Sequence, residues 1–104
     1  ICKRAKPRFS TIIATGGVAS GLDAAKAIVL GAHVAGIARP VLQAFVSGGR
    51  EGALAFLAQV EAEIRAVMLL VGAGSLRALR KAPFVMTGAL PRWAELPKEP
   101  RKEA

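Results

Sequence analysis

The chain has 104 residues, of which 53% are hydrophobic and only 5% aromatic, and its formal net charge is +8. No apolar run reaches the roughly 18 residues of a membrane-spanning helix. One cysteine and one histidine argue against a metal site built from these two residue types. The basic excess is compatible with a nucleic-acid surface, but no aromatic residues for base stacking are interleaved with the charges.

Small and aliphatic residues dominate the composition, which is typical of strands covered on both faces and of closely packed helices. The single cysteine, Cys2, cannot form an internal disulfide, which favours a cytoplasmic protein. The basic start leads into a strand and a turn, a pattern that is not typical of a signal peptide. The sequence begins at Ile1 without a methionine. We therefore expect a piece of a larger protein, or a chain that assembles with other copies.

The first predicted strand covers residues 11–15, TIIAT, where β-branched residues dominate, and we expect it to be buried. The chain then turns through Gly16-Gly17. A helix is expected to begin at Ser20 or Gly21 and to end at Leu30. Gly31 follows, a residue that suits the left-handed conformation found after many helices.

The second predicted strand covers residues 34–38, VAGIA, directly before Arg39-Pro40. A strand, a helix and a strand within about 30 residues predict a βαβ unit whose two strands are parallel. The fold class is therefore α/β. In such units the strand-to-helix turns lie together at one edge of the sheet, where ligands bind.

The chemistry of these two turns predicts a phosphate site. The first turn has glycines that can adopt positive φ and let a ligand approach the main chain. Its amides would face the same space as the amino end of the following helix, whose unpaired N–H groups suit a phosphate. The second turn adds a guanidinium group. The predicted contacts are Gly16, Gly17, Val18, Ala19, Ala38 and Arg39. The alternative is a tight glycine turn and an exposed arginine without a ligand.

Two other polar residues are interpreted as structural. Asp23 lies in the first turn of the predicted helix, where a negative charge complements the helix dipole, and we favour this role over that of a catalytic carboxylate. His33 precedes the second strand, at the sheet edge opposite the glycine turns. Residues at that edge usually serve stability, so we do not assign His33 as a general base.

Past Pro40 the pattern is helical. A short helix is predicted for residues 41–46, a break at Ser47-Gly48-Gly49, and a long helix from Glu51 to about Val71. Apolar residues recur at spacings of three and four along the long helix and predict a packing face. Met68 is assigned to the core within it. The stripe consists of Leu54, Leu57, Val60, Ile64, Val67 and Val71.

Glu61 and Arg65 are spaced to form an ion pair on a more polar face of that helix. Ser75 is the predicted N-cap of a short helix, residues 76–81, that ends before Pro83. We divide the chain into residues 1–96, which form the body, and residues 97–104, PKEPRKEA. The latter are charged and proline-rich, and we expect them to be frayed or disordered.

At the level of longer motifs the sequence resembles a known family. Residues 13–32, IATGGVASGLDAAKAIVLGA, followed by residues 34–40, VAGIARP, are similar to the last two βα units of an FMN-dependent (β/α)8 TIM barrel. In that superfamily the loops after strands seven and eight hold the flavin phosphate. The resemblance implies an incomplete barrel, with strands seven and eight and the terminal helices within residues 1–96.

Two branches of the superfamily share these motifs: the α-hydroxy-acid oxidases and dehydrogenases, and type 2 isopentenyl-diphosphate isomerase. The oxidases place an aspartate before the two glycines and an arginine after them, at the positions of Thr15 and Ala19 here. IATGG and GIARP are closer to the isomerase motifs IASGG and GMARP. Residues 81–93, KAPFVMTGALPRW, are similar to the isomerase tail. We therefore favour the isomerase branch and keep the oxidase branch as the alternative.

The resemblance implies an enzyme that interconverts isopentenyl and dimethylallyl diphosphate in isoprenoid biosynthesis. That family uses FMN, Mg2+ and NAD(P)H and forms homo-oligomers of four or eight subunits. The expected partners are a small diphosphate substrate and the remainder of the barrel, not nucleic acid or membrane. The family's catalytic and Mg2+-binding residues lie earlier in its barrel. We therefore expect no catalytic or metal-binding residue in this chain and no activity from it alone.

Carried over to this sequence, the family's phosphate contacts fall on Gly17, Val18 and Ala19, with Gly16 shaping the first turn, and on Ala38 and Arg39 in the second. Many isomerases have an arginine where this chain has Ala19, so that contact would be made by the main chain only. A third hypothesis, from another class, is a basic module that binds phosphate or a nucleic-acid backbone. Such binding would weaken steeply with salt and would not depend on flavin.

Overall fold

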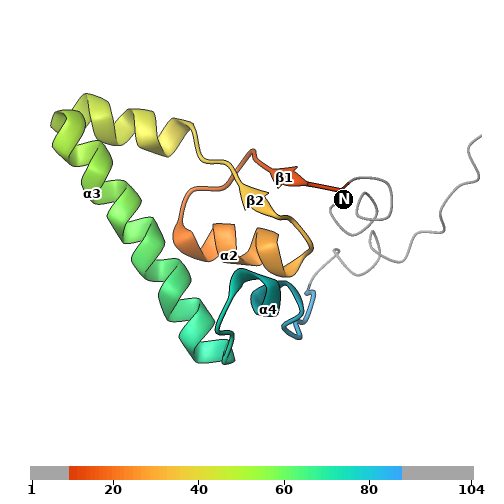
Figure 1. Ribbon diagram of the computed structural model, residues 1–104. Coiled ribbons are helices and arrows are strands. Elements are labelled where there is room, and N and C mark those ends of the chain that lie inside the picture. Colours follow the sequence, from red (N-terminus) through yellow and green to blue (C-terminus); the bar gives the residue numbers. More distant parts are fainter. Residues whose placement is uncertain (1–9, 88–104) are drawn as a thin grey trace, which may run out of the picture.

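The computed structural model describes residues 10–87, so the basic segment before Ser10 and the charged tail 97–104 lie outside the described residues. The elements follow in the order β1 (Ile13–Ala14), α2 (Gly21–Val29), β2 (Val34–Ala35), α3 (Arg39–Val71) and α4 (Leu76–Arg80). Helix α2 is central, because it contacts β2, α3 and α4 (Figure 1). None of the helices in this part of the chain is both long and apolar enough to cross a membrane.

The two strands are parallel, as predicted for a βαβ unit. Ile13 pairs with Val34 and Ala14 with Ala35. Each strand has only two residues, shorter than the predicted segments 11–15 and 34–38. The expected burial of the first strand is wrong here, because Ile13 is 65% exposed, and Val34 beside it is 48% exposed. Within residues 10–87 each strand has one neighbour only, which leaves little to extend the ladder or to cover these side chains.

Both ends of α2 are fixed by local signals that the sequence carries. Ser20 is the N-cap, and its hydroxyl accepts a hydrogen bond from the Asp23 amide at 3.2 Å. At the other end Gly31 has a φ of 115°, and its amide donates to the Ile28 carbonyl at 3.0 Å. The Ala32 amide donates to the Ala27 carbonyl, which completes a Schellman motif. The predicted bounds of this helix are confirmed to within one residue.

The core is small and lies between the three helices. Leu79 of α4 is completely buried against Ala25 and Ile28 of α2, with Val67 and Met68 of α3 partly buried around them. The assignment of Met68 to the core is therefore confirmed. The Ser75 hydroxyl caps α4 by accepting from the Ala78 amide at 3.1 Å, as predicted.

Helix α3 contains a sharp bend, visible in Figure 1 as two arms joined at an angle. The bend lies at Gly49, whose φ of 64° and ψ of −155° are not helical. The predicted break is thus confirmed, although the first arm begins at Arg39, earlier than expected. The predicted ion pair is also present, with Arg65 Nη2 2.8 Å from Glu61 Oε1. Helix α3 ends at Gly72, which is in the left-handed conformation.

The apolar stripe of α3 is a packing face only in part. Val60 is buried, whereas Leu54 and Leu57 are 53% and 46% exposed and Val71 is 48% exposed. The expectation of one continuous packing face is therefore wrong for the described residues. Val60 lies at the close contact with Gly21 of α2, which accounts for its burial.

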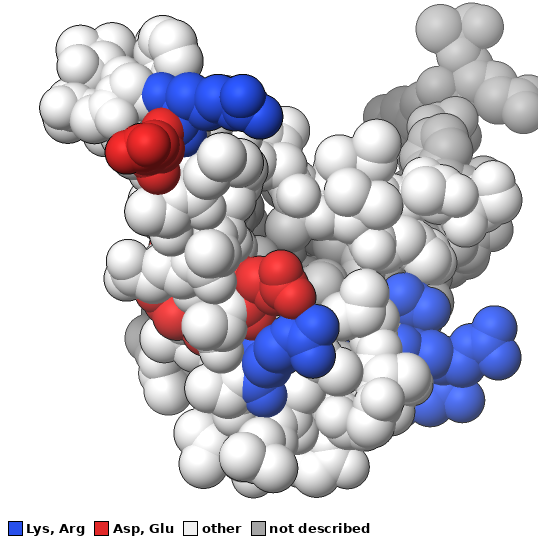
Figure 2. Space-filling view, turned by 60° about the vertical axis from the view of Figure 1, so that its left-hand side comes forward, with Lys and Arg blue, Asp and Glu red and all other residues white. Residues whose placement is uncertain are grey.

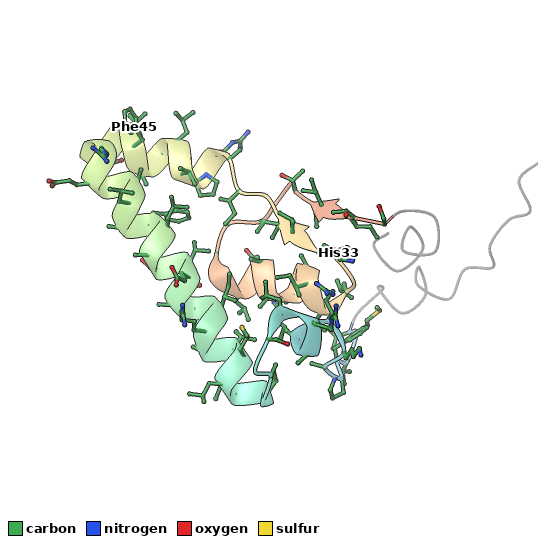
Figure 3. All side chains as sticks on the ribbon, viewed as in Figure 1. His33 and Phe45 are labelled. Atoms are coloured by element: carbon green, nitrogen blue, oxygen red, sulfur yellow. The ribbon has the colours of Figure 1, made fainter. Side chains whose placement is uncertain are left out.

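His33 has the structural role predicted for it, at the start of β2 (Figure 3). Its Nδ1 accepts a hydrogen bond from the Ile12 amide at 3.1 Å, and its own amide donates to the Ile12 carbonyl at 2.9 Å. The ring nitrogen and the main chain thus extend the contact between the two strands beyond the short ladder. A nitrogen that accepts in this way carries no proton.

Helix α2 approaches α3 so closely that only glycine fits at Gly21. A Cβ there would collide with the Glu63 Cβ and the Val60 carbonyl oxygen. We predict that Gly21→Ala lowers the free energy of unfolding by about 1–3 kcal/mol, the usual cost of overpacking. Denaturant titration would measure it. Gly48→Ala is the matched control, because a Cβ at Gly48 meets nothing within 4 Å. Equal stability of the two variants would contradict this account of the packing.

Candidate phosphate-binding site

The two strand-to-helix turns are joined at the carboxyl edge of the sheet. The Gly36 amide donates to the Ala14 carbonyl at 2.7 Å, and the Thr15 hydroxyl donates to the Gly36 carbonyl at 3.2 Å. A Cβ on Gly36 would lie only 3.1 Å from Thr15 Cβ and Oγ1, so the absence of a side chain permits this approach. Sequence reasoning used Thr15 only to separate two enzyme branches and missed its bond across the turns. The available signal was a hydroxyl at a strand end facing a glycine in the neighbouring turn.

The first turn presents main-chain donors to open space. Gly16 and Gly17 have φ angles of 88° and 76°, and a Cβ on either would meet nothing within 4 Å. Within residues 10–87 the amides of Gly17 and Val18 have no hydrogen-bond acceptor. This conformation strongly favours glycine, and it leaves two neighbouring N–H groups free to bind an anion. The contacts predicted for these three residues fit the geometry and stay a prediction.

Most of the donors expected to be open at the amino end of α2 already have acceptors. The Ala19 amide donates to Asp23 Oδ2 at 3.1 Å, and the Gly21 amide donates to Glu63 Oε2 at 2.9 Å. The Asp23 amide donates to the Ser20 hydroxyl. The helix-start role of Asp23 is therefore confirmed. The assumption of a free helix end holds only in part, because the amides of Gly21 and Asp23 are occupied, whereas the Leu22 amide has no acceptor within residues 10–87. The predicted contact from Ala19 stays a prediction, and it requires that its N–H exchange Asp23 for the phosphate.

Sequence reasoning also missed Glu63, which lies 42 residues after Gly21 in the chain. Its other carboxylate oxygen, Oε1, accepts from Gln59 Nε2 at 3.1 Å. No local pattern links Glu63 to the turn, because the contact depends on how α3 folds back against α2. The one signal in the sequence is the lack of a side chain at Gly21, which permits this approach.

The amino end of α3, by contrast, is open. Ala38 is its N-cap and makes no side-chain capping bond, and the first turn contains no acidic residue. Pro40 has no N–H to satisfy, but the first-turn amides of Arg39 and Val41 have no acceptor in residues 10–87. Arg39 is exposed and forms no ion pair with the described residues. The partial positive charge of a long helix and one guanidinium group therefore lie beside the first turn.

Charge in the described region is mixed. Residues 10–87 contain seven Lys and Arg against four Asp and Glu, so most of the net charge of +8 lies outside them. Acidic and basic side chains lie next to one another over α3 in Figure 2. Over α3 the basic side chains therefore form no continuous surface of the kind that a nucleic-acid backbone would require, although Figure 2 also shows a small basic cluster at its right-hand side.

Comparison with known proteins agrees with a phosphate-binding role for these turns. A model of the FMN-dependent dehydrogenase family matches residues 1–86. The chain belongs to this family. Members are TIM-barrel enzymes, and a parallel strand pair with a crossover helix is consistent with part of such a barrel.

Several curated proteins with sequences similar to this chain are named isopentenyl-diphosphate delta-isomerase. That of Aeropyrum pernix is 45% identical over 84 residues, which are 81% of this chain and 22% of the relative. That of Symbiobacterium thermophilum is 46% identical over 85 residues, 82% of this chain and 23% of the relative. That of Thermococcus kodakarensis is 45% identical over 94 residues, 88% of this chain and 25% of the relative. The chain thus spans about a quarter of the length of the relatives it matches.

The bond between Thr15 and Gly36 yields a testable prediction. Thr15→Val removes the hydroxyl but keeps the shape, and we expect the free energy of unfolding to fall by about 1 kcal/mol, the typical worth of one hydrogen bond. Thr15→Ser, which keeps the donor, is expected to lose less. Denaturant titration of both variants measures the difference. A valine variant as stable as the serine variant would show that the bond does not hold the turns together.

Proposed function

We propose that this chain supplies the phosphate end of an FMN site. The phosphate would bind between the amides of Gly17 and Val18 and the open amino end of α3, with Ala19, Ala38 and Arg39 beside it and Gly16 shaping the turn. The observation that carries the proposal is that unpaired amides of two neighbouring turns meet at one sheet edge, in a member of a family named for FMN. Bound FMN would supply the redox-active flavin ring, and these residues would hold and orient it.

We further propose that β1 and β2 are strands seven and eight of a (β/α)8 barrel, with residues 1–96 belonging to that barrel. Two features support this. Ile13 and Val34, paired in register, are both apolar and largely exposed. Each strand also has a free edge within the described residues. The remainder of the barrel would cover the apolar pair and extend the sheet, so it is the first partner of this chain.

The activity that we propose for the whole protein is the interconversion of isopentenyl and dimethylallyl diphosphate. The names of the curated relatives and the motifs around Thr15 and Arg39 support it. Mg2+ and NAD(P)H, a homo-oligomeric assembly and a cytoplasmic location are part of the same proposal. Catalytic and Mg2+-binding residues would come from the rest of the barrel, because this chain contributes the cofactor end alone.

An FMN-dependent α-hydroxy-acid oxidase or dehydrogenase is the second candidate, and the description of the matching family model supports it. Thr15 and Ala19 disfavour it, because the oxidases have an aspartate and an arginine at these two positions. A basic module for nucleic acid is disfavoured, because the described residues have few charges in excess and mix both signs.

The activity prediction is tested on the full-length protein that carries this chain. We expect the purified protein to show flavin absorbance and, with the flavin reduced and Mg2+ present, to convert isopentenyl diphosphate into dimethylallyl diphosphate. Product analysis by mass spectrometry with a deuterium label measures the conversion. Oxidation of a 2-hydroxy acid in place of isomerisation would select the oxidase branch. A protein that binds no flavin would refute the proposed site itself.

The role of Arg39 is tested by comparing FMN with riboflavin, which lacks the phosphate. Arg39→Ala is expected to weaken FMN binding by roughly tenfold, because one exposed, charge-assisted contact is lost, and to leave riboflavin binding unchanged. Arg50→Ala, an exposed arginine on the far side of the α3 bend, is the matched control. Fluorescence titration gives both dissociation constants. Equal affinity of wild type and Arg39→Ala for FMN would remove Arg39 from the site.

A further inference from the structure

Glu63 anchors the α2 end of the first turn from outside the β1–α2 unit. It lies on the second arm of α3, and its Oε2 accepts from the Gly21 amide at 2.9 Å, across a contact too tight for a side chain at Gly21. Gln59, one helical turn earlier, donates to Oε1 at 3.1 Å and restrains the carboxylate. Glu63 is only partly buried, yet both of its oxygens are engaged.

The loop that presents the open amides of Gly17 and Val18 contains two consecutive glycines, the residue type whose backbone has the most conformational freedom. Gly16 and Gly17 have positive φ angles with no packing around them. The segment is restrained at its start by the Thr15 hydroxyl on the Gly36 carbonyl and at its end by the bonds at Ala19 and Gly21. Asp23, which accepts from Ala19, moves with α2. Among the described residues, only the hydrogen bond to Glu63 links the α2 end of this segment to another helix or strand.

We propose that Glu63 is a positioning residue for phosphate recognition. By holding the first amide of α2 against α3, it fixes where the Gly17 and Val18 amides stand relative to the open amino end of the same helix α3. Helix α3 would then position both sides of the site. Its first turn would contact the phosphate, and its second arm would hold the loop that contains Gly17 and Val18. The inference rests on the proposed FMN site and adds to it a residue that does not contact the ligand.

The proposed effect of Glu63 on FMN binding comes from the position that it gives the loop, and it differs from the effect of the Glu63 charge. A carboxylate near a phosphate is electrostatically unfavourable, so a purely electrostatic view predicts tighter FMN binding whenever Glu63 loses its charge. A positional role predicts weaker binding whenever the bond to Gly21 is lost, whether or not the charge remains, because the turn must then be ordered on binding. The two roles are distinguished by variants that change the charge of the side chain and its length independently.

The experiment measures FMN and riboflavin binding to the full-length protein for three variants at this position. Glu63→Ala removes the bond and the charge, and Glu63→Asp keeps the charge but is one methylene too short to reach. We expect both to reduce the preference for FMN over riboflavin by about tenfold, the worth of one charge-assisted bond, with riboflavin affinity unchanged. Glu63→Gln keeps an acceptor oxygen and is expected to keep the wild-type preference or exceed it. Glu61→Ala, an exposed residue of the same arm, is the control.

Each outcome supports or overturns the inference. Loss of FMN and riboflavin affinity by the same factor in the alanine and aspartate variants would mean a merely structural role, and unchanged ratios would mean no role. Weaker FMN binding in Glu63→Gln than in Glu63→Asp would also overturn it. If Glu63→Ala does not fold, the aspartate and glutamine variants still decide. A wild-type protein without preference for FMN would instead refute the proposed site, and a wild-type preference with insensitive variants would refute the role of Glu63 alone.

Discussion

The arrangement of this chain depends on the close contact between the amino end of α2 and the second arm of α3. Gly21 permits the approach, and the Glu63 carboxylate satisfies the amide that the approach would otherwise bury without a partner. The contact sets the position of α2, against which Leu79 of α4 packs and from which β2 continues. The bend at Gly49 is what brings the second arm of α3 back to α2 after the first arm has started beside the sheet edge.

The sequence predicts well those features that depend on a residue and its immediate neighbours. The start of α2 at Ser20 or Gly21, the left-handed Gly31, the cap at Ser75 and the break at Gly49 are confirmed to within a residue or two. Each follows from a side chain that bonds within one helical turn, or from a φ that glycine adopts without strain. Burial was less predictable, because Ile13 and Leu54 are apolar by type but expose much of their surface in the absence of a covering element.

In the candidate site, too, the local features were predictable from the sequence and the long-range contacts were not. Its glycine turn, its arginine and its family were accessible from the motifs, since they are consecutive residues. The state of the helix ends was not, because capping of α2 involves Glu63, a carboxylate 42 residues away from its partner. As a result the more open positive end belongs to α3, whose first turn has neither a capping side chain nor an acidic residue. Two helices with equivalent places after parallel strands thus differ in their capacity to bind an anion.

The parallel pairing also has a kinetic consequence. The contacts that join the two turns link residues 21 or 22 apart, and the Gly21–Glu63 bond links residues 42 apart, so none of them can form from local structure alone. Closing such loops costs entropy that local helix formation does not, and high contact order slows folding. Helix α2 and the arms of α3 can form early, whereas the Gly17 and Val18 amides acquire their mutual arrangement only when the long-range contacts close. A ligand held by those amides would bind only the completed fold and would stabilise the contacts that form last.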